Sequence, residues 1–260
     1  MVLESPHTGL LAVASVVQCL DCFFLLCPRS RGPNFLAMPV TLISLVYIYS
    51  KGKEKQMIHE IRTYNLKPRS IELFGENTKA KLTKRLEYSA LGGFWYTEMG
   101  PLNQVVHIWP YDDLNERAKI RRRATADGVW PPDNDNLIMD MRSDIMIPAP
   151  FMKPMGPSCI GPIYEMRIYT YRPRDIPLVL QAWADCIEDR EAYSTLGGCW
   201  YSDVGELNKF VHLWGYKSLE ERAKIRAEVI ECGVWPPRSE AVPLKQENKI
   251  LVPFDFSPMQ

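Results

Sequence analysis

Apolar and polar residues alternate along several short stretches of this chain, and each such stretch occurs twice. The segments "MIHEIRTYNL" (57–66) and "PIYEMRIYTY" (162–171) alternate and are rich in β-branched and aromatic residues. This pattern predicts a strand in each segment. Two further strands are predicted on either side of a turn at Gly100, and again at Gly205. A last strand, "SDIMIPAPF" or "NKILVPFDF", ends each copy.

Helical periodicity separates these strands. A helix is expected after the first strand of each copy, with Ser70 or Asp175 as its N-cap. In the second copy one face of this helix is formed by apolar residues at helical spacing, namely Ile176, Val179, Leu180, Trp183 and Ile187.

A second helix follows the third strand and carries an N-terminal capping box in each copy. The capping pairs are Asp113 with Glu116 and Ser218 with Glu221. Glycines that favour a left-handed C-terminal cap, followed by a proline pair, are expected to end it; they are Gly128 and Gly233.

The two copies align without gaps at an offset of 105 residues, as from Gly92 to Gly197. An agreement of this length indicates that a whole domain was duplicated. We therefore predict an α+β protein with two tandem ferredoxin-like (β-α-β-β-α-β) repeats, residues 57–155 and 163–260, joined by a linker at 156–162. Each repeat leaves one sheet face open, and the two faces can bury each other in a pseudo-dimeric α/β barrel.

Residues 1–56 form an apolar leader that the duplication does not include. Its segment 9–27 approaches the ~20 apolar residues of a membrane span, but contains Gln18 and Asp21. Three interpretations remain: a targeting segment, a weak membrane anchor, or sequence upstream of a true start at Met38 or Met57.

The composition narrows the classes of function. The formal net charge is +0, which gives no general attraction for nucleic acid or an anionic membrane. The seven cysteines form no repeated framework, since Cys186 and Cys199 correspond to Lys81 and Phe94. We therefore expect reduced thiols and an intracellular compartment. The "CLDC" pair in the leader is read as incidental.

The segments "LNQVVHIWPYDDLNERAKIR" and "LNKFVHLWGYKSLEERAKIR" resemble the signature of the NIPSNAP family, as do "IYEMRIY" and "LGGCWYSDVGELN". The resemblance covers residues 57–260. It implies a dimeric α/β-barrel fold and an adaptor or quality-control role in mitochondrial and vesicle biology, without a defined reaction. It also implies a mitochondrial location, with the cytoplasm as the alternative.

Polar residues common to both copies are the candidate cavity-lining residues. One strand carries Asn, His and Trp on a single face, and the first strand carries Glu, Arg and Tyr on one face. If these faces point into the barrel, they line a cavity with Asn103, His107, Trp109, Asn208, His212, Trp214, Glu60, Arg62, Tyr64, Glu165, Arg167 and Tyr169. The alternative is that the histidines are buried and hydrogen-bonded, with Glu60–Arg62 as a structural ion pair.

Two functions follow from these alternatives. The first is a non-enzymatic adaptor with protein partners and no cofactor, able to hold a small apolar ligand in the barrel. The second is a cavity enzyme of the monooxygenase type, in which His107 or His212 acts as a base or binds haem iron. Because both copies keep the same residues, we favour the adaptor. The four histidines show no zinc-ligand spacing.

Helix residues Arg117/Arg121 and Arg222/Arg226 are spaced at i, i+4. They could bind a phosphate or an acidic partner. Their acidic neighbours favour a salt-bridged helix face instead.

Overall fold

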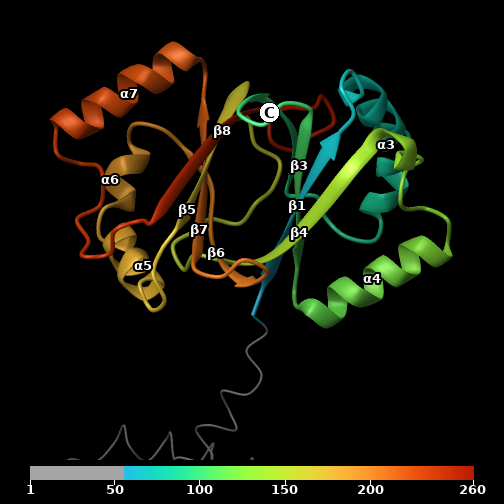
Figure 1. Cartoon of the computed structure of the whole chain (residues 1–260), viewed down its shortest axis with the longest axis horizontal. Coiled ribbons are helices and arrows are strands. Elements are labelled where there is room, and N and C mark those ends of the chain that lie inside the picture. The colour runs from blue at the N-terminus through green and yellow to red at the C-terminus, as the bar shows by residue number, and fades with distance from the viewer. Residues whose placement is uncertain (1–55) are drawn as a thin grey trace, which may run out of the picture. The chain divides into compact units, whose positions relative to one another are not determined.

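The computed structural model describes residues 56–260, so the expectations for the leader lie outside the described residues. These residues form a closed barrel of eight antiparallel strands, with the helices on its outer sides (Figure 1). The first repeat contains β1 (Ile58–Leu66), α3 (Ile71–Leu86), β2 (Gly93–Met99), β3 (Gln104–Tyr111), α4 (Leu114–Ala126), the short η1 (Asp135–Leu137) and β4 (Ile138–Pro148). The second contains β5 (Ile163–Thr170), α5 (Ile176–Ala184), α6 (Ile187–Glu191), β6 (Leu196–Val204), β7 (Lys209–Tyr216), α7 (Leu219–Glu231) and β8 (Lys245–Pro253).

The barrel closes because the repeats complete each other's sheets. Around it the strand order is β1-β3-β2-β8-β5-β7-β6-β4, and β4 pairs with β1. The last strand of each repeat pairs with the second strand of the other, with Trp95 opposite Pro253 and Trp200 opposite Pro148. Each repeat alone would expose β2 and β4, or β6 and β8, as unpaired edges. This confirms the prediction of a closed two-repeat barrel.

The barrel interior is filled by apolar side chains from both repeats. Its largest members are Trp95 and Trp200, each 0% exposed. Around them pack residues that alternate with the polar candidates, including Ile61, Val106 and Ile108. A second apolar layer lies between the sheet and the helices, where Phe74 of α3 packs near the outer face of β2 and β3.

The helix caps agree with the sequence prediction in part. Asp113 and Ser218 accept hydrogen bonds from the backbone N–H of Glu116 and Glu221, at 2.8 and 3.1 Å. Ser70 and Asp175 precede their helices as predicted, but their side chains make no capping hydrogen bond. Both glycines that end the second helices are left-handed, at φ 67° for Gly128 and 69° for Gly233.

The single helix predicted through Ile187 is interrupted. Helix α5 ends at Ala184 and α6 begins at Ile187, although Val179, Trp183 and Ile187 are all buried as the periodicity indicates. The break comes at Cys186, whose backbone is not helical. The helical spacing of the apolar residues identified the buried face correctly. These residues remain on the buried side although the backbone turns between the two helices.

Asn103 and Asn208 lie in turns, outside β3 and β7. Their φ angles are +54° and +58°, a left-handed conformation that Asn adopts more readily than most residues. Their carbonyl oxygens accept hydrogen bonds from Leu66 N and Tyr171 N, at 2.8 and 2.9 Å. The expectation that these asparagines share a strand face with the histidines is therefore wrong, because each strand begins one residue later.

This conformation leads to a prediction about stability. Replacement of Asn103 with Ala is expected to lower the free energy of unfolding by about 1 kcal/mol, because alanine is strained at positive φ. Asn103→Gly should be close to neutral. Urea denaturation of both variants checks this, and equal losses in the two would contradict it.

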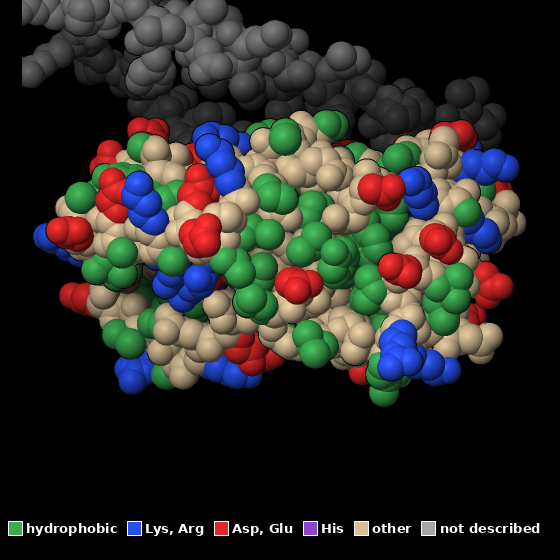
Figure 2. All heavy atoms as spheres, turned by 90° about the horizontal axis from the view of Figure 1, so that it is seen from above, with side chains coloured by type: hydrophobic (Ala, Val, Ile, Leu, Met, Phe, Trp, Pro, Cys, Tyr) green, Lys and Arg blue, Asp and Glu red, His purple; other side chains and the backbone are tan. Residues whose placement is uncertain are grey.

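The described surface mixes charges of both signs. On the face drawn in Figure 2, acidic and basic side chains are interspersed around a central apolar area. The described cysteines, Cys159, Cys186, Cys199 and Cys232, are free thiols. Within residues 56–260, no helix has the length and apolarity needed to cross a membrane.

Candidate functional site

The polar faces singled out in the sequence point outward, toward the helices. In β1 and β3, Arg62 lies opposite His107 and Glu60 lies opposite Trp109. The alternate residues of the same strands, such as Ile61 and Val106, fill the interior. The expectation that these faces line the barrel interior is therefore wrong. Strand alternation shows that two faces differ, but it does not show which face the helices cover.

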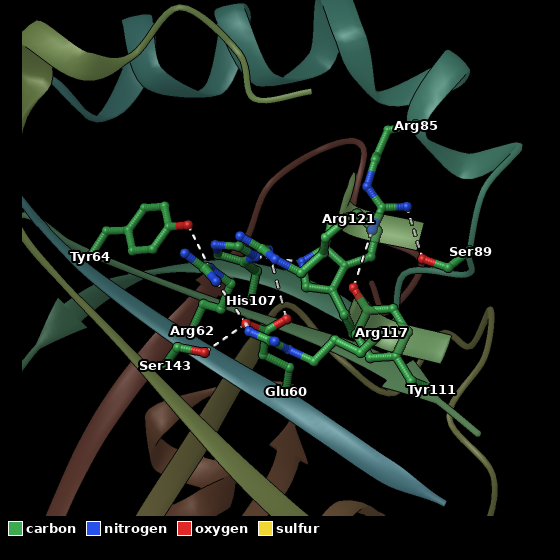
Figure 3. Close-up of polar contacts among 11 residues, drawn as sticks. Glu60, Arg62, Tyr64, Arg85, Ser89, His107, Tyr111, Arg117, Arg121 and Ser143 are labelled. Atoms are coloured by element: carbon green, nitrogen blue, oxygen red, sulfur yellow. Dashed lines mark hydrogen bonds and ion pairs between the residues drawn. The ribbon is translucent and has the colours of Figure 1, made fainter. Parts of the chain in front are cut away.

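Glu60 is the centre of a buried ion-pair cluster, formed by Glu60, Arg62, Arg117, Arg121 and Ser143 (Figure 3). Its Oε1 accepts hydrogen bonds from Arg62 Nη1 at 2.7 Å, Arg117 Nη2 at 2.6 Å and Ser143 Oγ at 2.6 Å. Arg121 Nη1 lies 3.8 Å from Oε2. Because both helix arginines meet a strand carboxylate, this cluster holds α4 on the sheet. The salt-bridged interpretation of the arginine pair fits these contacts.

The second repeat reproduces the cluster around Glu165. Arg167 and Arg222 donate to its carboxylate at 2.8 and 2.5 Å, and Asn248 takes the place of Ser143. Burial alone would raise the pKa of each central glutamate. Hydrogen bonds from Arg117 or Arg222, together with the nearby positive charges, outweigh burial and lower both values to about 2. Both carboxylates are therefore ionised at neutral pH.

His107 is a buried, neutral hydrogen-bonding residue. Its Nδ1 accepts a hydrogen bond from Trp109 Nε1 at 2.6 Å, and its ring stacks on Phe94 at 4.6 Å. Burial, and next the charge of Arg62, hold the pKa of His107 well below 6.5. A neutral imidazole has one proton, and the indole N–H occupies the lone pair of Nδ1. The proton is therefore on Nε2, which has no hydrogen-bond partner among the described residues.

His212 has the same arrangement with Trp214 Nε1, at 2.7 Å. General-base catalysis and iron ligation through Nε2 both need a free lone pair on that atom. The indole bond places a proton there instead, so these histidines do not fit an axial haem ligand. No group of three or more His, Cys, Asp or Glu side chains in residues 56–260 could hold a metal ion.

Arg85 is a site residue that the sequence reasoning missed. It comes from α3, is 2% exposed, and stacks its guanidinium on Trp109 at 4.3 Å. Its hydrogen bonds go to Ser89 Oγ at 2.8 Å and to Tyr111 Oη at 3.2 Å (Figure 3). Arg190 repeats this arrangement on Trp214. The 105-residue offset relates the two arginines, so the alignment of the copies contained the signal.

A cavity of about 180 Å³ lies between the sheet and the helices of the first repeat. Its buried floor includes His107, Arg85 and Phe94, and its rim includes the partly exposed Arg121. Of the sequence candidates, Arg62, Tyr64 and His107 line this cavity. Glu60 and Trp109 lie beside it, bonded to residues that line it.

The second repeat divides the corresponding space. Trp183 stands where the first repeat has Thr78, and its ring lies 4.6 Å from both His212 and Trp235. One space of about 250 Å³ contains His212 with Tyr169, and a separate one of about 200 Å³ contains Arg167 with Tyr169. The histidine and the arginines therefore share one cavity only in the first repeat, among the described cavities.

A family model described as NIPSNAP matches residues 59–153 and 164–258. The human protein NipSnap homolog 3B is 32% identical over 220 residues, covering 78% of this chain and 85% of that protein. NipSnap homolog 3A of Pongo abelii is 30% identical over 218 residues, covering 78% of this chain and 86% of that protein.

The fold has relatives of lower sequence similarity among solved structures. A Fusobacterium nucleatum protein described as a candidate monooxygenase superposes with a TM-score of 0.53 at 10% identity. The match covers 77% of this chain and 94% of that protein. At this identity the likeness concerns the barrel fold alone.

Proposed function

Because this chain belongs to the NIPSNAP family, we propose that it is a non-enzymatic adaptor that binds a basic, amphipathic segment of a partner protein. The observation that carries this proposal is a groove at the junction of the two repeats. The neutral, proton-bearing histidines support it, since they offer neither a base nor a metal ligand. We further infer that each repeat is a ferredoxin-like unit, because its own strands follow the order β4-β1-β3-β2 or β8-β5-β7-β6.

The acidic groove is an open depression of about 1010 Å³ that runs between α3 and the paired strands β2 and β8. Apolar side chains contribute to its lining, among them Tyr96, Phe254 and the 68% exposed Leu102. The charged residues that line it are Glu72, Glu76, Lys79, Glu98 and Asp255. Lys79 pairs with Asp255 at 2.5 Å, which leaves three glutamates around an apolar surface.

The other repeat junction keeps only part of this charge, since Glu98 corresponds to Asp203. At the offset of 105 residues, Glu72 corresponds to Pro177, Glu76 to Gln181 and Asp255 to Pro150. The groove is therefore a feature of one junction, whereas the barrel contacts are common to both. An occupant with Lys or Arg beside apolar side chains would pair with the glutamates while covering the apolar lining.

Binding of a defined peptide tests this proposal. A labelled peptide of alternating Lys and Leu is expected to bind the full chain in fluorescence anisotropy, more weakly as salt rises. The same peptide with Glu for Lys should not bind. In the variant Glu76→Lys/Glu98→Lys, affinity is expected to fall about tenfold or more, because attraction becomes repulsion.

The chain offers a matched control at the other junction. Gln181→Lys/Asp203→Lys changes the exposed counterparts of the same two positions and adds a similar charge. Its effect on peptide affinity is expected to stay below about twofold. Equal losses in the two variants, or binding unchanged by Glu76→Lys/Glu98→Lys, would exclude the acidic groove as the docking surface.

We propose that this adaptor role concerns mitochondrial quality control and vesicle trafficking, and that the protein associates with mitochondria. The family assignment supports this proposal. Residues 9–27 are the proposed membrane contact, if they persist in the mature chain. Mass spectrometry of the endogenous N-terminus tests that point, and a start at Met38 or beyond would rule out the contact.

A further inference from the structure

We propose that the cavity of the first repeat binds a small monocarboxylate with a compact apolar body, of the size of benzoate. This site is distinct from the acidic groove and does not depend on the adaptor function. Three observations carry it: an excess of buried positive charge, an unpartnered donor on the floor, and apolar walls of matching size. The second repeat supplies the internal comparison.

The cavity has more positive charge than its surroundings neutralise. Arg62, Arg85 and Arg121 line it, and the acidic residue that lines it is Asp135, on the exposed rim. Within the described part of the chain, Glu60, beside the cavity, is the single carboxylate paired with Arg62, Arg117 and, at 3.8 Å, Arg121. Arg85 is buried and has no ion pair with a carboxylate among residues 56–260. A buried guanidinium in this position favours an anionic ligand.

The floor also presents a hydrogen-bond donor. His107 lines the cavity and is 2% exposed, and its buried Nε2–H has no hydrogen-bond partner within the described residues. A buried donor without an acceptor destabilises the protein unless a ligand or solvent molecule accepts from it. A carboxylate has two oxygens, so one can accept from His107 while the other faces an arginine.

The remaining walls are apolar. Phe74, Phe94, Trp130, Ile138 and Met141 are among the lining residues. The volume of about 180 Å³ is close to the ~150 Å³ of an apolar protein cavity that accommodates benzene. A single ring or a short branched chain therefore fits, whereas a long acyl chain or a nucleotide does not.

The second repeat explains why the ligand would occupy one repeat. Trp183 and Cys199 replace Thr78 and Phe94. The large aromatic side chain of this pair is therefore on the strand in the first repeat and on the helix in the second. Trp183 lines the space at His212, and a separate space contains Arg190. No described space there offers a histidine donor and an arginine together. The ion-pair cluster around the central glutamate is thus present in both repeats, whereas a cavity that contains both the histidine and the arginines is described in the first repeat alone.

Calorimetric titration of the full chain with sodium benzoate tests the proposal. Benzoate is expected to bind at least about tenfold more tightly than benzamide, which lacks the charge, or acetate, which lacks the ring. Arg121→Gln, at the rim, is expected to weaken benzoate about tenfold. Its counterpart Arg226→Gln, in the second repeat, should leave the affinity unchanged; the side chains are 37% and 35% exposed.

A transplanted side chain gives a second test. Thr78→Trp/Phe94→Cys installs the residues of the second repeat in the first and is expected to abolish benzoate binding. If this variant fails to fold, the arginine comparison still decides the question. The proposal is overturned if benzoate does not bind, if benzamide or acetate binds as tightly, or if Arg121→Gln and Arg226→Gln act alike.

Discussion

Replacement of Glu60 with Gln is expected to lower the free energy of unfolding by about 3–5 kcal/mol. The carboxylate is 0% exposed and accepts from Arg62, Arg117 and Ser143. The amide keeps the shape but loses the charge, which leaves the largely buried Arg62 and the partly buried Arg117 and Arg121 without a counterion. Removal of one partner from a buried ion pair is more damaging than replacement of the whole pair by apolar groups.

Urea denaturation with matched controls measures this effect. Glu165→Gln should cause a loss of similar size, because its contacts are nearly the same. Glu247→Gln, at a 50% exposed side chain paired with the 63% exposed Lys245, should change stability by less than about 1 kcal/mol. A loss at Glu60 no greater than at Glu247 would show that the cluster does not hold α4 on the sheet.

The protein is expected to lose stability in two stages as the pH falls below neutral. In the first stage the histidines act. Burial lowers the pKa of His59 to about 4 and holds those of His107 and His212 well below 6.5. The unfolded chain therefore takes up these protons first, near pH 6.5. Each histidine lowers the stability by roughly 1.4 kcal/mol per pH unit from 6.5 down toward its folded value.

In the second stage, protonation of the central glutamates also lowers the stability of the protein. The folded pKa values of Glu60 and Glu165 are about 2, against the usual 4.5. Their contribution is complete above pH 4.5 and is lost as the pH falls from 4.5 through 2. Both stages increase the stability that the protein loses as the pH falls.

Urea midpoints at pH 7, 5.5, 4 and 3 measure these stages. His59→Gln retains an acceptor for Trp200 Nε1, which donates to His59 Nδ1 at 2.8 Å. This variant is expected to reduce the slope between pH 6.5 and 4 by about one third, because it removes one of the three buried histidines of residues 56–260. A stability that stays constant from pH 7 to pH 4 would refute neutral burial of the histidines.

The fold was largely predictable because its main features are local or repeated. Alternation located the strands, and the capping boxes at Asp113 and Ser218 located the second helices. The open sheet face of each predicted repeat indicated that the other repeat covers it. The break between α5 and α6 was not predictable, since Val179, Trp183 and Ile187 keep one helical face across it.

The sequence predicted several residues that belong to the site, but not where they lie in the fold. Arg62, Tyr64 and His107 were singled out by their recurrence at one offset, and all three line the cavity of the first repeat. Their placement inside the barrel was wrong, because a strand with two buried faces shows no exposed side from which to orient it. Arg85 was missed because an arginine in a helix gives no local signal of burial, and only its recurrence as Arg190 marked it.

The sequence by itself determined the duplication, the strand and helix order, and the residues that both copies require. These properties follow from periodicity and spacing, which depend on neighbouring positions along the chain. Only the tertiary structure decided that the recurring polar faces meet the helices, that Trp109 places the proton of His107 on Nε2, and that the second repeat has two separate spaces, one of them lined by Trp183. These properties depend on which side chains from distant segments reach the same space.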